Sequence, residues 1–279
     1  MKIAVTGASG FVGRHVLVQL GRYDVEIVAI TREAARLHDL AKSIRIVEMD
    51  IAHSTPNCFE KMGEPDILIH LAWDGLPNYK SLHHFETELP RQYFFLKGMI
   101  EAGLQSLLIT GTCFEYGMQS GALSATMPTK PNNPYGYAKD ALRQQLEYLK
   151  LVSPFNLIWA RLFYIYGENQ SGASLYPKLK EAVLRGDNIF NMSGGEQLRD
   201  YLPVENVASQ IVKLALAQQD VGNINICSGE PISVRRLVEQ WLYEKHWEIE
   251  LNLGHYPYPD YEPMAFWGEL YAESAPLSR

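Results

Sequence analysis

Short apolar runs alternate with stretches of helical spacing through the first 160 residues of the chain. Runs rich in Val, Ile and Leu occupy residues 2–6, 26–30, 44–49, 67–71 and 107–110. Between most of them apolar residues recur every three or four positions, as at Val12, Val16 and Leu20. Strands separated by helices predict a parallel sheet with helices on both faces. The expected fold is therefore α/β, a Rossmann-type doubly wound parallel sheet.

The second half of the chain is less regular. A helix is predicted from about 135 to 150, a strand at 155–160, and helices at 204–217 and 234–244 around a strand at 223–227. Segments 168–172 and 192–198 have the composition of loops, and 255–268 is crowded with Tyr, Pro and Phe. We expect residues 1–165 with about 199–228 to form the main domain, and 166–198 with 229–279 to form a smaller, interleaved C-terminal lobe.

Charge and cysteine content exclude several classes of protein. The 279 residues carry a net charge of −7 without a block of Lys or Arg, whereas nucleic acids and acidic membranes favour a basic face, so neither is expected as a partner. The three cysteines form no metal-type pair, and neither a metal site nor a disulfide framework is expected. With no signal-peptide pattern and no run of 18 apolar residues, we expect a cytoplasmic protein.

Three glycines follow the first predicted strand directly, in T-G-A-S-G-F-V-G at residues 6–13. Gly7 permits a tight turn, Gly10 lets the backbone approach a pyrophosphate, and Gly13 lets the helix pack closely on the strand. The N–H groups at the start of that helix then face the phosphates. With the required strand before and helix after, the motif predicts a dinucleotide site. A purely structural turn is the alternative.

The end of the second predicted strand bears on the choice between NAD and NADP. An acid there would bond to the ribose 2′-hydroxyl and repel a 2′-phosphate. The chain has Thr31-Arg32 instead, and a guanidinium pairs well with phosphate. We therefore favour NADP, as NADPH, with NAD as the alternative; Arg32 could also be an exposed loop residue without a ligand.

A Tyr and a Lys four residues apart lie near the start of the helix predicted at 135–150. Asn133-Pro134 is a natural helix start, and residues i and i+4 place Tyr135 and Lys139 on one face. A nearby ammonium should lower the pKa of Tyr135 from about 10, so that the phenol can exchange a proton as hydride moves. Thr112 lies at the carboxyl edge of the sheet, where ligands bind, and is predicted to bond the reacting oxygen.

These motifs, taken in order, resemble those of the extended short-chain dehydrogenases/reductases that modify nucleotide sugars, the NAD-dependent epimerase/dehydratase family. The resemblance spans nearly the whole chain. It rests on residues 6–13, Asp50-Ile51, His70-Leu71-Ala72, Thr112 with Tyr116-Gly117, Tyr135 with Lys139, R-L-F-Y-I-Y-G at 161–167, and Arg199-Asp200-Tyr201 before V-E-N-V-A at 204–208.

The resemblance implies roles for the matching residues. Cofactor-binding residues would be Gly7, Ser9, Gly10, Phe11, Val12, Gly13, Thr31, Arg32, Asp50, Ile51, Leu71, Ala72, Tyr135 and Lys139. Asp50 and Ile51 would flank the adenine, Lys139 would also hold the nicotinamide ribose, and Tyr135 would be the acid/base.

Substrate-binding residues would be Thr112, Asn169, Lys178 and Arg199. Arg199 would clamp the diphosphate of a nucleotide sugar; the alternative is an ion pair with Asp200 or another acid. By the same analogy, helices near 83–103 and 135–150 would form a homodimer interface.

Departures from the family pattern reduce the number of reactions that we expect of this chain. Dehydratases similar to this chain carry Asp-Glu directly after the catalytic Thr, where this chain has Cys113 and Phe114, and Glu115 comes one place too late. Synthases that epimerise before reducing use a Cys at the place of Phe114. We therefore expect Cys113 to be structural, and neither dehydration nor double epimerisation to be the reaction.

Redox chemistry at one carbon remains. We expect NADPH-dependent reduction of the C4 keto group of a nucleoside-diphosphate-4-keto-6-deoxysugar, as in deoxysugar or O-antigen biosynthesis. An NAD-dependent C4 epimerase is the main alternative, although E-L-P-R-Q at 88–92 replaces an Asn-x-x-Gly-Thr-like stretch typical of epimerases. A non-catalytic NADP-binding sensor or scaffold on the same fold is the minor alternative.

Overall fold

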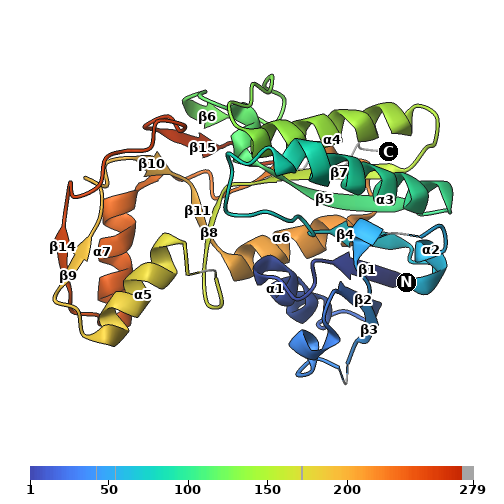
Figure 1. Ribbon diagram of the computed structural model, residues 1–279, viewed down its shortest axis with the longest axis horizontal. Helices are drawn as coiled ribbons and strands as arrows, with labels where there is room; N and C mark the ends of the chain where they lie inside the picture. Colours follow the sequence, from blue (N-terminus) through green and yellow to red (C-terminus); the bar gives the residue numbers. More distant parts are fainter. Residues whose placement is uncertain (42, 54, 171, 272–279) are drawn as a thin grey trace, which may run out of the picture.

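Seven parallel strands form the central sheet of the computed structural model, which describes residues 1–41, 43–53, 55–170 and 172–271 (Figure 1). Their order across the sheet is β3-β2-β1-β4-β5-β7-β12. The strands are β1 (Lys2–Thr6), β2 (Glu26–Thr31), β3 (Arg45–Glu48), β4 (Ile67–His70), β5 (Ser106–Thr112), β7 (Asn156–Leu162) and β12 (Gly222–Ile226). The order reverses direction between β1 and β4, as a doubly wound Rossmann sheet requires. The predicted fold class is confirmed.

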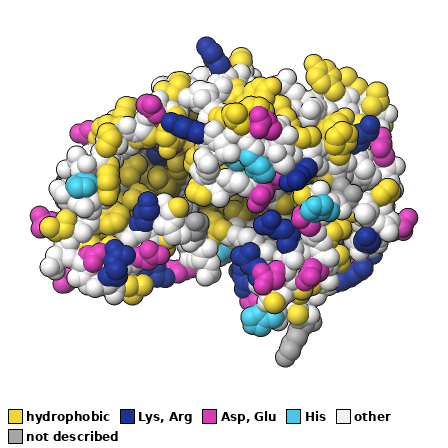
Figure 2. Space-filling model, viewed as in Figure 1, with side chains coloured by type: hydrophobic (Ala, Val, Ile, Leu, Met, Phe, Trp, Pro, Cys, Tyr) yellow, Lys and Arg dark blue, Asp and Glu magenta, His cyan; other side chains and the backbone are white. Residues whose placement is uncertain are grey.

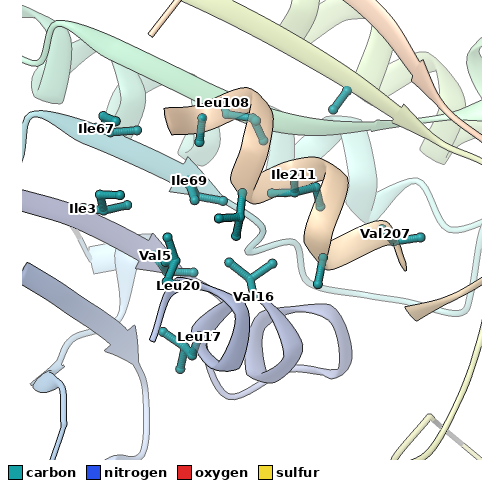
Figure 3. Packing of buried hydrophobic residues seen from close by; sticks show 14 of the residues in the cluster. Ile3, Val5, Val16, Leu17, Leu20, Ile67, Ile69, Leu108, Val207 and Ile211 are labelled. Atoms are coloured by element: carbon teal, nitrogen blue, oxygen red, sulfur yellow. The ribbon is translucent and has the colours of Figure 1, made fainter. Parts of the chain in front are cut away.

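Helices cover both faces of this sheet. On one face lie α1 (Phe11–Leu20) and α6 (Val204–Ala217); on the other lie α2 (Cys58–Lys61), α3 (Leu89–Glu101) and α4 (Pro134–Lys150). Ile3 and Val5 belong to the core shared with α1 and α6, whereas Ala4 belongs to the opposite core. This is the two-residue alternation of a strand buried on both faces. Figure 3 shows Val16 of α1 and Ile211 of α6 in the first core.

A smaller lobe lies to the side of the sheet, at the left of Figure 1. It contains α5 (Leu175–Arg185), α7 (Val234–Lys245) and the parallel pair β9 (Ile189–Asn191) and β14 (Glu250–Asn252). Its own core includes Tyr176, Leu179, Phe190 and Trp241. Chain order interleaves the lobe with the large sheet, because α6 and β12 come between α5 and α7.

Short strand pairs connect the lobe and the sheet. They are β8 (Tyr164–Tyr166) with β11 (Tyr201–Pro203), β10 (Leu198–Arg199) with β13 (Ile232–Ser233), and β6 (Gly121–Leu123) with β15 (Phe266–Gly268). The remaining helical elements of the described chain are single turns: η1 (Ala34–Leu37), η2 (Ile51–His53), the π-helical η3 (His84–Glu88) and η4 (Cys113–Tyr116). No helix in the described part of the chain is long and apolar enough to cross a membrane.

Candidate active site

The glycine turn after β1 is closed so tightly that side chains are excluded. Gly7 has a φ of 64°, in the left-handed region, and a Cβ there would lie 2.8 Å from the backbone nitrogen of Ala72. A Cβ on Gly13 would lie 2.2 Å from the carbonyl oxygen of Gly7. The Gly10 N–H donates to that same oxygen at 2.9 Å, and α1 begins at the next residue. The absence of side chains at these glycines leaves the backbone at the start of α1 open to the close approach that a pyrophosphate requires.

A cavity of about 500 Å³ lies beside this turn, at the carboxyl ends of β1, β2 and β4. It is lined by most of the predicted cofactor residues: Gly7, Ser9, Gly10, Thr31, Arg32, Asp50, Ile51, Leu71 and Ala72. Gly13 is not among the lining residues and serves the packing of α1 against the turn. The residues present fit a dinucleotide in shape and in chemistry.

The end of β2 combines a buried hydroxyl with exposed guanidinium groups. Thr31 Oγ1 donates to Ser9 Oγ at 2.9 Å, which joins β2 to the glycine turn. Arg32 is 69% exposed, and its Nη1 lies 3.8 Å from Asp74 Oδ1, so the side chain is held only weakly. Arg36 and Glu33 also line the cavity. The guanidinium of Arg32 is therefore available to a ligand.

A second cavity, of about 720 Å³, adjoins the first and shares Leu71 and Trp73 with it. It lies between the carboxyl edge of the sheet and the small lobe, and its walls include Phe11, Val12 and Tyr176. In Figure 2 hydrophobic side chains surround the hollow between the two lobes. A dinucleotide that starts at the glycine turn and extends past Leu71 would end in this cleft.

Thr112, Tyr135 and Lys139 all line this second cavity. Asn133 caps α4 by accepting a hydrogen bond from the Gly136 N–H at 2.8 Å, with Pro134 in the first turn, as the sequence predicted. Tyr135 and Lys139 then lie on the buried face of α4, 8% and 1% exposed. Lys139 Nζ donates to the Thr110 carbonyl at 2.8 Å and lies 4.1 Å from the centre of the Trp73 ring.

The predicted effect of Lys139 on the phenol is wrong for this structure. Burial raises the pKa of Tyr135 above its usual value, the nearby Tyr79 and Glu115 add to the rise, and the Thr112 hydroxyl opposes it. Burial also lowers the pKa of Lys139 to about 7, against the nearby charges of Glu115 and Glu88. Desolvation is the largest cause of both shifts, because both groups are enclosed by protein.

A buried polar chain that the sequence did not reveal lies along the first cavity, with Thr6, Gln92 and Glu88 among the residues that line it. Thr6 Oγ1 donates to His70 Nδ1 at 2.8 Å, His70 Nε2 donates to Gln92 Oε1 at 2.6 Å, and Gln92 Nε2 donates to Glu88 Oε1 at 2.5 Å. The same Glu88 oxygen accepts from the Asp74 N–H at 3.1 Å. Burial lowers the pKa of His70 to about 3, which keeps the imidazole neutral. Glu88 and Gln92 stand four residues apart, the one signal that could have paired them.

Trp73 is a further residue of the site, one to which the sequence motifs gave no individual role. Its Nε1 donates to His84 Nδ1 at 3.1 Å, and His84 Nε2 donates to the Asn78 carbonyl at 2.9 Å. The indole is thereby fixed at the junction of the cavities, over Lys139 and at the edge of the Tyr135 ring.

Two residues of the turn that follows Thr112, Glu115 and Cys113, have structural contacts. Glu115 is fully buried, and its Oε2 accepts from Arg161 Nε at 2.6 Å. Cys113 packs with Tyr116 and Phe163 at the cleft wall, and burial raises the pKa of its thiol well above the ordinary value. Neither group offers the free acid and base that elimination of water needs.

The predicted substrate residues are dispersed. Asn169 and Lys178 are exposed, and neither lines the cleft. Arg199 is 2% exposed, and its Nη2 lies 2.9 Å from Glu262 Oε2, so the ion pair weighed as the alternative is formed, with Glu262 and not with Asp200. Gln170 and Glu262 do line the cleft.

Residues 3–227 match the NAD dependent epimerase/dehydratase family. The chain belongs to this family. Its membership confirms the resemblance drawn from the ordered motifs, and it identifies an NAD(P)-dependent enzyme of the extended short-chain dehydrogenase/reductase type. For a member of this family, we expect the dinucleotide to bind in the cavity beside the glycine turn.

Among curated relatives of this family member, dTDP-6-deoxy-L-talose 4-dehydrogenase (NAD(+)) of Aggregatibacter actinomycetemcomitans is 31% identical over 96% of this chain and 99% of its own. GDP-6-deoxy-D-talose 4-dehydrogenase of the same organism is 25% identical over 86% of this chain and 78% of its own. The solved UDP-glucose-4-epimerase of Stenotrophomonas maltophila, with bound NAD and formylated UDP-arabinopyranose, superimposes with a TM-score of 0.85 at 20% identity, covering 96% of this chain and 90% of that one. At this identity the superposition supports the fold alone.

Proposed function

We propose that the protein reduces the C4 keto group of a nucleoside-diphosphate-4-keto-6-deoxyhexose, reversibly, with a nicotinamide cofactor. The observation that carries the proposal is the convergence of Thr112, Tyr135 and Lys139 in the cleft that continues from the dinucleotide cavity. The relative at 31% identity is named as a 4-dehydrogenase of dTDP-6-deoxy-L-talose. Dehydrogenation at C4 is the reverse of ketone reduction at C4, so the same site chemistry serves both directions.

The raised pKa of Tyr135 suits the reductive direction. A reduced nicotinamide bound in this site would supply the hydride. Tyr135 keeps its proton at neutral pH and can give it to the C4 oxygen as negative charge develops there. Thr112 lies beside Tyr135 and can donate a second hydrogen bond to that oxygen. The enclosure of both side chains excludes water and strengthens these bonds.

The direct test is reduction of dTDP-4-keto-6-deoxyhexose by the purified protein, followed by loss of absorbance of the reduced nicotinamide. Tyr135→Phe should lower kcat by about 10²–10⁴-fold and leave the Kd for cofactor within about twofold, because the phenol's proton is needed only in the reaction. No oxidation of cofactor with dTDP- or GDP-linked 4-keto sugars would refute the proposal. So would stoichiometric NAD that stays bound through purification, as expected of a C4 epimerase, which reoxidises its cofactor in every turnover.

We further propose NADPH as the preferred reductant, on the basis of Arg32 at the end of β2 and Arg36 near it. The NAD(+)-named relative favours the other cofactor. Arg32→Asp should lower the ratio of kcat/KM for NADPH over NADH by about tenfold or more, because a carboxylate repels the 2′-phosphate and accepts from a 2′-hydroxyl. Steady-state rates with both cofactors measure this ratio. An unchanged ratio would contradict the assignment to Arg32.

A further inference from the structure

The buried ammonium of Lys139 has few partners in the protein. The side chain is 1% exposed, and its one hydrogen bond in the described part of the chain goes to the Thr110 carbonyl at 2.8 Å. The Trp73 ring covers a second side, with its centre 4.1 Å from Nζ. An ammonium has three N–H donors. One is used by the carbonyl and one side meets the indole, so a donor remains for a ligand.

Trp73 is the group that takes the place of a counter-ion at this ammonium. No carboxylate is hydrogen-bonded to Lys139 in the described part of the chain, and Glu115 and Glu88 act on it only through their charge. The face of an indole carries negative charge density and attracts a cation, more strongly where water is excluded. The contact therefore stabilises the ammonium and fixes where it lies.

The indole is itself held in one orientation. Trp73 follows the end of β4 by three residues, in a loop without regular structure of its own. Its Nε1 donates to His84 Nδ1 at 3.1 Å, and His84 Nε2 donates to the Asn78 carbonyl at 2.9 Å. A neutral imidazole accepts at one nitrogen and donates at the other, so both bonds are made at once. His84 is fully buried and its ring stacks beside the indole, with 27° between the planes.

The same indole contacts the second reacting side chain of α4. Tyr135 precedes Lys139 by one helical turn, and its ring meets the Trp73 ring edge to face, with 6.0 Å between the ring centres. Trp73 also lines both cavities. A dinucleotide that extends from the glycine turn into the cleft would therefore pass this side chain, at the place where Lys139 has its free donor.

We propose that Trp73 is a positioning residue, whose indole holds the Lys139 ammonium so that its free N–H faces the bound dinucleotide beside Tyr135. His84 acts one step further away, because it fixes the indole. The inference rests on the proposed function where it concerns the reaction, whereas its effect on the cofactor can be tested without a sugar. If Trp73 acts through Lys139, its effect must disappear when the ammonium is removed.

A double-mutant cycle on the Kd of NADPH, or of NADH if that binds more tightly, tests this by calorimetry. Trp73→Leu keeps an apolar side chain and removes the aromatic face. We expect it to raise the Kd about tenfold in the wild type and by less than about twofold in the Lys139→Met background. Trp73→Phe keeps an aromatic face and should stay within about threefold of the wild type. Trp267→Leu, at a half-buried tryptophan that lines neither cavity, is the matched control with no expected change.

The reaction gives a second measurement. In the reduction of dTDP-4-keto-6-deoxyhexose, Trp73→Leu should lower kcat about tenfold and leave the KM for the sugar within about twofold. A residue that only packed the cleft wall would change the KM as well. Trp73→Phe should recover most of the lost kcat.

Equal losses of cofactor affinity in the wild-type and Lys139→Met backgrounds would overturn the inference, because Trp73 would then act independently of the ammonium. An unchanged Kd in Trp73→Leu, or a Trp73→Phe as weak as Trp73→Leu, would overturn it too. A wild type that binds the cofactor and reduces no 4-keto sugar would overturn the proposed function, while the binding cycle still decides the inference. Should Trp73→Leu fail to fold, Trp73→Met takes its place in the cycle.

Discussion

Lys139 is the residue on which burial has the clearest consequence. Its ammonium lies within the protein between the Thr110 carbonyl and the face of Trp73. These contacts stabilise the charge without replacing the hydration that the unfolded chain provides. The pKa falls to about 7 from an ordinary value of 10.5. At neutral pH the side chain is thus poised between its charged and neutral forms, a property expected of an active-site lysine and not of a surface one.

This shift predicts a pH-dependent stability. Between about pH 7 and pH 10.5 the unfolded chain binds a proton at Lys139 that the folded chain does not. The free energy of unfolding should therefore rise with pH in that window, by up to about 1.4 kcal/mol per unit. Lys139→Met, which is neutral at every pH, should lack this rise. Urea unfolding of both proteins from pH 6 to 9 measures it.

The difference in unfolding free energy between wild type and Lys139→Met should be flat below pH 7 and then grow in favour of the wild type. Lys213→Met, at an exposed position of α6, serves as the control, because its side chain is in water in both states. A difference that stays constant from pH 6 to 9 would show that Lys139 keeps its proton when folded.

At the scale of elements, Glu115 joins three parts of the sheet edge that carries Thr112. Its Oε1 accepts from the Thr112 N–H at 2.8 Å, at the end of β5, and so closes the first turn of η4. Both carboxylate oxygens accept from Trp159 Nε1, and Oε2 from Arg161 Nε, both on β7. The sequence placed Glu115 one position too late for a catalytic role, and the contacts explain its presence.

Glu115→Gln should destabilise the fold by about 3–5 kcal/mol, since it leaves the buried Arg161 without its counter-charge. The matched control is Glu239→Gln on α7, which removes an exposed i,i+4 pair with Arg235 and should cost less than about 1 kcal/mol. Chemical denaturation of the three proteins gives the comparison. Similar losses for both variants would mean that Arg161 finds another partner or is solvated.

The sequence predicted best those helices and strands whose hydrophobic residues recur with a clear period and whose ends are marked by a change in that pattern. Helix α6 has the predicted bounds, 204–217, and the five N-terminal strands lie within two residues of their predicted ends. The sequence analysis missed the short strands β8, β10, β11 and β13, because a strand of two or three residues is too short to show a periodic pattern of hydrophobic residues. Residue 171, part of a predicted loop, lies outside the described residues.

The residues of the site likewise fall into two groups, those that a local sequence pattern predicts and those that only the folded structure brings in. The glycine turn and the pair Tyr135/Lys139 are local in sequence, so their spacing sufficed to bring them to the cavities. Trp73 and Glu262 enter through tertiary contacts with His84 and Arg199, which no local pattern encodes. The direction of the Tyr135 pKa was predicted wrongly because charge proximity can be inferred from spacing, whereas desolvation depends on the packed fold.

At the scale of the whole molecule, α3 and α4 lie side by side on the outer face of the sheet (Figure 1). Large aromatic side chains remain exposed on them: Phe94 is 67% exposed on α3, and Tyr137 and Tyr148 are 54% and 71% exposed on α4. Tyr137 and Tyr148 stand eleven residues apart, three helical turns, and so share one face. The predicted homodimer would bury this surface against the same surface of a second copy, which two-fold symmetry allows.

Phe94→Asp together with Tyr148→Asp should convert a dimer into a monomer, because two charges per chain would be brought into an apolar, self-complementary contact. Light scattering after size exclusion measures the mass directly. Tyr243→Asp is the control: Tyr243 is 82% exposed on α7 in the small lobe, away from α3 and α4, and its replacement should leave the dimer intact. A wild type that is monomeric at tens of micromolar would contradict the dimer outright. A double variant that stays dimeric would place the interface on another surface, and the exposed aromatics of α3 and α4 would then need a different partner.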